Sequence, residues 1–423
     1  MKRRIQSILP VLLLFSFSGV LMGAEETFDF GGQVRTLLGW EGPGDGMLLE
    51  GEPSLWFQAT LSSSVSLELR ARLLSTLDTP RLFDLEKAVF QVQVPRYPEL
   101  DSSFSFKVGR QEISDFSTYV FDHRVDGAIF RWMFPFTEIQ LAGGYTGWQP
   151  REVSCIYLTS SDVLDSEDTS LTYGPRRMVE IATFLFPHLL LSQDLILSVL
   201  SQQDLRTREP DSSASGEDRI HTNYLGLGSK GRLYRNVLLS LFGYLSLGFG
   251  GVDYRLFSGI YGVSVLWKGR SREGIELEGM FLSASGDDRL DSIYDHTTVT
   301  ESSLFLPVSQ KDTGVAFSPL LANVSLLQFR GGFFPVPKLW VEGRMFFFFR
   351  TTAGPISESG LDPSDSTDLF LGPEWDLELA FQPYSDLKIR SSLGLFLPAS
   401  GSMGAFSPRN PWVKSTVEIV LSF

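Results

Sequence analysis

The chain has few of the residues that crosslink a protein or carry catalysis. Among 423 residues there is one cysteine, Cys155, so an intrachain disulfide is excluded. The four histidines, His123, His188, His221 and His296, are scattered along the chain. Neither a G-x-S-x-G motif nor an H-E-x-x-H motif occurs. We therefore expect no enzymatic activity, no catalytic residues, no cofactor and no metal site.

Positive charge is also scarce, since 36 Lys and Arg face 50 Asp and Glu, for a net charge of −14. Nucleic acid is therefore not expected as a partner. A long apolar run occurs only at 8–22, after the basic residues 2–4 and before the small residues Gly23 and Ala24. This pattern predicts an export signal peptide over 1–24, although the cleavage site stays open because Met22 is large.

What the chain has in abundance is the alternation of apolar and polar side chains. From Val65 to Leu73, apolar residues fall on one face of a strand and Ser66, Glu68, Arg70 and Arg72 on the other. The period of two recurs to the end of the chain. It predicts strands near 28–40, 54–61, 65–74, 85–94, 103–110, 127–134, 137–146, 177–186, 189–201, 220–228, 233–249, 257–268, 274–283, 321–334, 338–350, 371–381, 387–397 and 412–423.

The connections between these strands fall into two interleaved classes. The short ones are 62–64, 135–136, 187–188, 335–337 and 382–386. The long ones are 41–53, 75–84, 111–126, 147–176, 202–219, 284–320, 351–370 and 398–411. This asymmetry predicts an all-β fold, a transmembrane antiparallel barrel over 25–423. It has about eighteen strands, with sixteen as an alternative, and short turns and both termini on the periplasmic side.

The polar face of the strands must line the interior, because lipid offers no partners for polar groups. The lumen and selectivity residues expected here are Arg70, Arg72, Lys107, Arg110, Arg131, Glu276, Glu278, Glu342, Arg344, Asp376, Glu378, Lys388 and Arg390. The basic members come mostly from the third to sixth strands, and many acidic ones from the opposite side of the ring. We hypothesise a transverse field that orients charged solutes. The alternative is that these charges pair with their neighbours.

Two predicted loops are rich in acidic residues. Loop 284–320 contains Asp287, Asp288, Asp291 and Asp295, and segment 361–368 contains Asp362, Asp365 and Asp368. Spaced carboxylates can bind calcium, but neither run has the central Gly and final Glu of the twelve-residue calcium loop. A solvated acidic loop is the preferred interpretation. Whether either loop folds into the pore as a constriction stays open.

Two stretches resemble the alginate-export family of outer-membrane porins. One is FKVGRQEISDFSTYVFDHRVDGAIFRW at 106–132, and the other is LFLGPEWDLELAFQPYSDLKIRSSLGLFLP at 369–398. Arg110, Asp126, Glu374 and Asp376 match the family's motifs. The resemblance implies an eighteen-stranded monomeric barrel that passively exports or takes up a solute such as an anionic polysaccharide. The mixed signs of the expected lumen depart from the basic funnel of such conduits.

These patterns predict an integral protein of the bacterial outer membrane. The leading functional hypothesis is a porin for passive diffusion of small polar or charged solutes through a mixed-charge lumen. The alternative is a surface-exposed adhesin or ligand-binding barrel that acts through its long outer loops, and a third reading is a soluble periplasmic β-protein. Expected partners are outer-membrane lipid, small polar or anionic solutes, and the barrel-assembly machinery, for which a final strand ending at Phe423 resembles the assembly signal.

Overall fold

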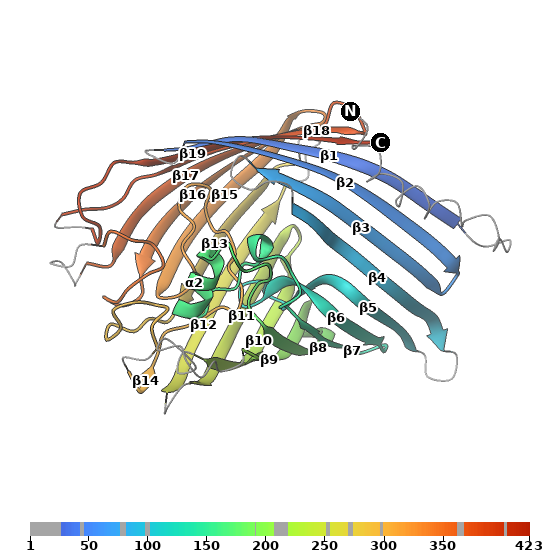
Figure 1. Ribbon diagram of the computed structural model, residues 1–423, viewed down its shortest axis with the longest axis horizontal. Helices are drawn as coiled ribbons and strands as arrows, with labels where there is room; N and C mark the ends of the chain where they lie inside the picture. The colour runs from blue at the N-terminus through green and yellow to red at the C-terminus, as the bar shows by residue number, and fades with distance from the viewer. Residues whose placement is uncertain are drawn as a thin grey trace.

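Consecutive strands lie side by side as antiparallel neighbours and close into a ring (Figure 1). The computed structural model describes residues 27–42, 46–76, 82–97, 102–190, 192–206, 219–250, 254–269, 274–296, 299–361, 368–401 and 404–423. The predicted signal peptide, 1–24, lies outside these residues. Eighteen long strands of the described chain form the ring, and a two-residue strand, β14, pairs beside it. The predicted barrel is therefore confirmed with eighteen strands, which excludes sixteen.

The first half of the ring is β1 (Thr27–Gly42), β2 (Gly46–Ser62), β3 (Val65–Thr76), β4 (Leu82–Tyr97), β5 (Ser102–Ser114), β6 (Asp122–Met133), β7 (Glu138–Tyr145), β8 (Arg177–Leu190) and β9 (Gln193–Asp204). The second half is β10 (Ile220–Tyr234), β11 (Val237–Gly250), β12 (Tyr254–Lys268), β13 (Glu276–Ala284), β15 (Val324–Val336), β16 (Leu339–Arg350), β17 (Phe370–Phe381), β18 (Leu387–Phe396) and β19 (Trp412–Ser422). The strand β14 is Glu301–Ser302.

The predicted alternation of short turns and long loops is confirmed for the long connections 146–176, 205–219, 285–323, 351–369 and 397–411. The loop predicted at 75–84 is shorter, because β3 ends at Thr76 and β4 begins at Leu82. The loop expected at 41–53 is wrong, because β2 begins at Gly46 and pairs with β1 over this segment. The Gly, Glu and Pro content of segment 41–53 suggested a loop, yet its backbone forms the hydrogen-bond ladder between β1 and β2. The loop expected at 111–126 shrinks to 115–121. The turn expected at 187–188 is also wrong, since β8 continues to Leu190 through a register shift, with His188 at φ 53°.

The last strand closes the ring by pairing with the first. Val417, Ile419 and Leu421 point to the outer face with 38%, 39% and 45% of their surface exposed. Glu418 lies on the inner face, where it contacts Arg35 of β1. Beyond the strand, the backbone of Phe423 exchanges two hydrogen bonds with Gly32, at 2.8 and 2.9 Å. The terminal strand thus pairs with β1 from Gln33 to Gly42.

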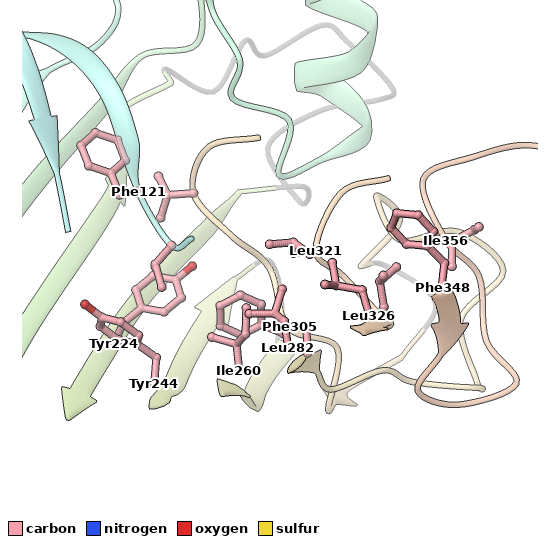
Figure 2. Close-up of a cluster of buried hydrophobic side chains, with 14 of the residues drawn as sticks. Phe121, Tyr224, Tyr244, Ile260, Leu282, Phe305, Leu321, Leu326, Phe348 and Ile356 are labelled. Carbon is pink, nitrogen blue, oxygen red and sulfur yellow. The ribbon is translucent and has the colours of Figure 1, made fainter. Parts of the chain in front are cut away.

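Long loops turn inward at the end opposite the short turns and build an apolar core inside the ring. Figure 2 shows strand residues such as Tyr244, Leu282 and Phe348 gathered with the loop residues Phe305 and Leu321. We call this set of buried side chains the interior cluster. Its strand members come from β5–β13 and β15–β18, and its loop members from 115–121, 285–323, 351–369 and 397–411. Loop 285–323 therefore enters the ring, which the sequence left open.

The helical content is small. A single turn, η1 (Arg151–Val153), and the helix α2 (Ser160–Glu167) lie in the loop between β7 and β8. Thr159 and Asp162 form a capping box at the start of α2, which satisfies its first backbone donors. In the described part of the chain, no helix has the length and apolar character needed to cross a membrane.

Substitutions at two adjacent residues of β18 test which face of the strand lies outside the ring and which lies inside. Leu393 is 45% exposed on the outer face, whereas Ser392 bonds to Thr416 inside. If lipid or detergent surrounds the ring, Leu393→Lys should destabilise it by about 2–4 kcal/mol near mid-membrane. Ser392→Lys should cost about 1 kcal/mol, the lost hydrogen bond. Urea unfolding in lipid vesicles measures both, and equal costs would contradict the assignment.

Candidate functional site: the charged interior wall

A chain of alternating charges runs around one arc of the interior, from β19 across β1–β4 to β6. Arg35 contacts both Glu418 and Glu52, the latter at 2.7 Å. Arg72 lies 3.2 Å from Glu52 and 3.0 Å from Asp84. Opposite-charge neighbours on adjacent strands stabilise this arrangement, because each charge keeps a partner after partial desolvation. We call these residues, with Arg124, the first charge ladder.

The buried carboxylate of Asp84 is the junction of the first charge ladder. It accepts a hydrogen bond from Arg72 at 3.0 Å and one from Arg124 at 2.7 Å. Arg110 approaches to 4.0 Å and binds Asp126 through two parallel hydrogen bonds of 2.8 and 2.7 Å. This bidentate geometry fits the planar guanidinium and fixes its orientation.

A second charge ladder crosses β13–β17 on the far side of the ring. Arg330 lies 3.4 Å from Glu276, 3.0 Å from Glu278 and 3.5 Å from Glu342. Arg344 continues the ladder, at 2.7 Å from Glu342 and 2.6 Å from Glu378. Here carboxylates outnumber the arginines that they contact, so this wall keeps a negative excess.

The remaining predicted lumen residues differ in how fully they are paired. Arg70 lies 4.0 Å from Glu86, Arg131 lies 2.9 Å from Glu138, and Arg390 lies 3.8 Å from Glu418. For Lys107 and Lys388, the described residues place no carboxylate within 4.0 Å. The two predicted sectors thus occupy opposite sides of the ring, but most of their charges meet a local partner. Local pairing weakens the predicted transverse field, because paired charges cancel at a distance.

Sequence reasoning missed Arg35, Glu52, Asp84, Arg124 and Arg330. Glu52 fell in the segment assigned to a loop, and Asp84 fell one residue before a predicted strand. Both lie on continuous strands, and their pairing with Arg35 and Arg72 follows from the register. Extending the alternation of β2 toward the long loop would have placed Glu52 on the inner face. Asp84 could not be found in this way, because a register shift between Lys87 and Leu85 turns it inward.

Loop 285–323 is fastened to β17 by carboxylates that accept backbone hydrogen bonds. Glu374 accepts from the N–H groups of Ala316 and Phe317 at 2.7 and 3.0 Å, and Asp376 accepts from Val315 at 3.2 Å. Glu374 is fully buried. These three hydrogen bonds satisfy backbone donors of the loop and hold its backbone in one position.

The side chain of Phe317 completes this attachment. Its ring stacks on Phe396 with centroids 4.1 Å apart and meets Phe348 edge-on at 4.9 Å. Phe406 and Trp412 close the other sides of the ring. Glu374, Asp376 and Phe317 together form what we call the loop anchor. Glu374 and Asp376 were matched by family resemblance, and their contacts give them a structural role here.

Loop 115–121 meets loop 285–323 from the other side. The buried carboxylate of Asp115 accepts from the N–H groups of Val120 and Phe121 at 3.1 and 2.8 Å and from the Tyr244 hydroxyl at 2.9 Å. The two loops join where the N–H of Val308 donates to the carbonyl of Val120 at 2.8 Å. Lys311 reaches Thr118, and burial lowers the pKa of its ammonium. Hydrogen bonds therefore join loop 115–121 to loop 285–323.

The interior cluster is placed asymmetrically. No described residue of β1–β4 belongs to it. On this arc, charged side chains stay partly open to the interior, with exposed fractions of 34% for Arg35 and 40% for both Arg70 and Lys87. The unfilled part of the ring thus runs beside β1–β4, between the first charge ladder and the inward loops.

The loop between β7 and β8 is anchored by charges that are fully removed from solvent. Arg177 lies 2.6 Å from Asp162 and 3.1 Å from Asp204. Cys155 is in this loop, and burial raises the pKa of its thiol to about 11. The thiolate that reacts with electrophiles is therefore rare at neutral pH. Among the described residues, no group of three or more His, Cys, Asp and Glu could hold a metal ion.

Comparison with known proteins supports the fold. No protein-family model matches the chain, and no curated protein matches it by sequence. Solved structures of Pseudomonas aeruginosa channels do match. OccK11 (OpdR) has a TM-score of 0.57 at 13% identity, covering 95% of this chain and 99% of that one. OccK2 (OpdF) has a TM-score of 0.56 at 14% identity, and the match covers 94% of this chain and 97% of that one. The outer membrane protein OprD has a TM-score of 0.54 at 12% identity, and the match covers 96% of this chain and 95% of that one. This chain has the fold of these outer-membrane channels.

The loop anchor should set the width of the interior opening. Phe317→Ala removes a buried ring at a cost of about 3–5 kcal/mol, which falls mainly on the loop. We expect a higher single-channel conductance and entry of larger polyethylene glycols. Phe257→Ala, on the outer face with 62% exposure, is the matched control and should conduct like the native protein. If both variants conduct alike, the anchor does not limit the opening.

Proposed function

We propose that the protein is an outer-membrane channel through which small polar or charged solutes diffuse passively. The observation that carries this proposal is the partly exposed, ion-paired wall of β1–β4 facing the loops that fill the rest of the ring. Such a wall can hydrate a solute throughout its passage, while the loops restrict its size. No step of this transport makes or breaks a covalent bond, so no catalytic group or cofactor is proposed.

The solute class follows from the pairing of the charges. Arg70, Arg72, Lys107, Arg110 and Arg131 on one side, with the second charge ladder on the other, would interact with both signs of charge. We propose these residues as the selectivity lining, together with Lys388 and Arg390 near the short turns. A wall of alternating signs favours small charged or zwitterionic solutes over a long polyanion. Alginate export, the activity implied by the sequence resemblance, therefore receives less support than small-solute diffusion.

Placement in the membrane is also part of the proposal. An apolar outer face on a closed ring is what lipid requires, since no sheet edge remains. The short turns and both chain ends would face the periplasm, after removal of residues 1–24. Phe423, at the end of the closing strand, would be read by the barrel-assembly machinery. The barrel would work as a monomer, because each ring encloses its own passage.

The adhesin hypothesis has a weaker structural basis. A ligand-binding barrel needs outer loops that stand free, but loop 285–323 is packed inside the ring. The loop carrying α2 is fastened by Arg177 and by the bond from Ser160 N–H to the carbonyl of Tyr294 at 3.0 Å. Loops that bury their own apolar side chains leave less surface for a partner.

Ion selectivity tests the proposed lining in two directions. Neutralising Arg70, Arg72 and Lys107 to Gln leaves Glu52 and Asp84 short of a partner, so the wall becomes more negative. The cation-to-anion permeability ratio should rise by at least about twofold. Asp84→Asn leaves Arg72 and Arg124 short of a carboxylate and should lower that ratio.

The measurement is the reversal potential of single channels in a planar bilayer under a salt gradient. Opposite shifts for the two variants support conduction along the first charge ladder. If neither variant moves the reversal potential, these residues do not line the conducting path. If the purified barrel inserts without discrete ohmic steps, the channel proposal itself fails.

A further inference from the structure

A cup lined by aromatic rings and lysines lies at the short-turn end of the ring. It is formed where the β15–β16 turn meets the β17–β18 turn, and its volume is about 460 Å³. The two turns are tied together, because the Lys338 ammonium donates to the carbonyl of Pro383 at 2.6 Å and the N–H of Gln382 donates to the carbonyl of Lys338 at 2.9 Å. The cup is thus a built feature of two bonded turns.

The cup opens toward the interior. Its Trp340 lies on the same face of β16 as Glu342 and Arg344 of the second charge ladder, and the indole N–H donates to Glu342 at 3.3 Å. Phe334 packs against Trp340 with ring centroids 4.7 Å apart. Lys388 shares the inner face of β18 with Arg390, which contacts Glu418. A solute that leaves the passage at this end meets these side chains.

The charge of the cup is positive and uncompensated. The nearby Glu342 carboxylate is already bound by Arg330 and Arg344. Within the described chain, neither Lys338 nor Lys388 has a carboxylate within 4.0 Å. Two ammonium groups therefore line one cavity while the closest ladder carboxylates are engaged elsewhere. An anion that entered the cup would provide the negative charge that these two ammonium groups lack.

The kinds of residue indicate the kind of anion. Ammonium groups are compact point charges suited to phosphate, whereas planar carboxylates are best matched by the two parallel bonds of an arginine. Among the described residues that line the cup there is no arginine. The faces of Phe334, Trp340 and Tyr384 offer flat apolar surface with a polar tip, which suits the C–H face of a sugar ring. Pockets that combine apolar rings with a few polar groups are typical small-molecule sites.

We propose that this cup binds sugar phosphates at the short-turn mouth of the channel. The ring of the solute lies against Trp340 and Phe334, and its phosphate lies between Lys338 and Lys388. The site concentrates this class of solute at one end of the passage. The inference rests on the proposed channel function and adds a solute class to it.

Single-channel recording with glucose 6-phosphate tests the site. Added from the side of the short turns, it should interrupt the current, while glucose and inorganic phosphate each block at least about tenfold more weakly. Lys388→Gln and Trp340→Ala should each weaken the block about tenfold, the loss expected for one charge-assisted contact or one stacked ring. Lys230→Gln and Trp56→Ala change an inner-face lysine and tryptophan outside the cup and should leave the block unchanged.

Two results would overturn the inference. A conducting channel that glucose 6-phosphate does not block, or blocks equally well in Lys388→Gln and Lys230→Gln, excludes the sugar-phosphate site while the channel function stands. Inorganic phosphate that blocks as strongly as glucose 6-phosphate shows that the rings take no part, which also contradicts the proposal. Absence of ohmic steps from the native barrel is the separate result that removes the channel function itself.

Discussion

The hydrogen-bonded pairing of β19 with β1 is the constraint on which the other features depend. A sheet of eighteen long strands with two open edges could not be surrounded by lipid, because the edge N–H and C=O groups would lack partners. Register also fixes which side chains face inward, since a shift of one residue would turn the charges of the shifted strand outward. The two bonds between Phe423 and Gly32 extend this register to the end of the chain.

Closure creates an interior too wide for strand side chains alone to fill, and the loops fill one side of it. Buried carboxylates make this arrangement specific. Asp115 and Glu374 each accept hydrogen bonds from backbone N–H groups of an inward loop, so these bonds hold the bends of both loops. The apolar side chains of the interior cluster then pack behind these bends. What remains open lies beside β1–β4, where paired charges stay in contact with water.

Much of the fold could be predicted from sequence because a period of two is a local property. Val65–Leu73 and 413–423 show their two faces without any knowledge of neighbours. The interior contacts could not be predicted in the same way. Glu374 meets Ala316 across 58 residues, and nothing in either segment indicates the pairing. Composition also misled at Glu52, where Gly and Pro suggested a loop although the register to β1 is continuous.

The most direct test of the account is whether solvent reaches the β1–β4 wall but not the surface behind the loops. Cysteines placed one at a time in a Cys155→Ser background report this through their reaction with a charged methanethiosulfonate. Gln58 of β2 is exposed on the wall. Ser246 of β11 and Ser258 of β12 are buried, on the side of the ring where the interior cluster packs. The account predicts a stepwise loss of current for Gln58→Cys and none for Ser246→Cys or Ser258→Cys. Equal modification of all three, or current loss only at the buried pair, would contradict it.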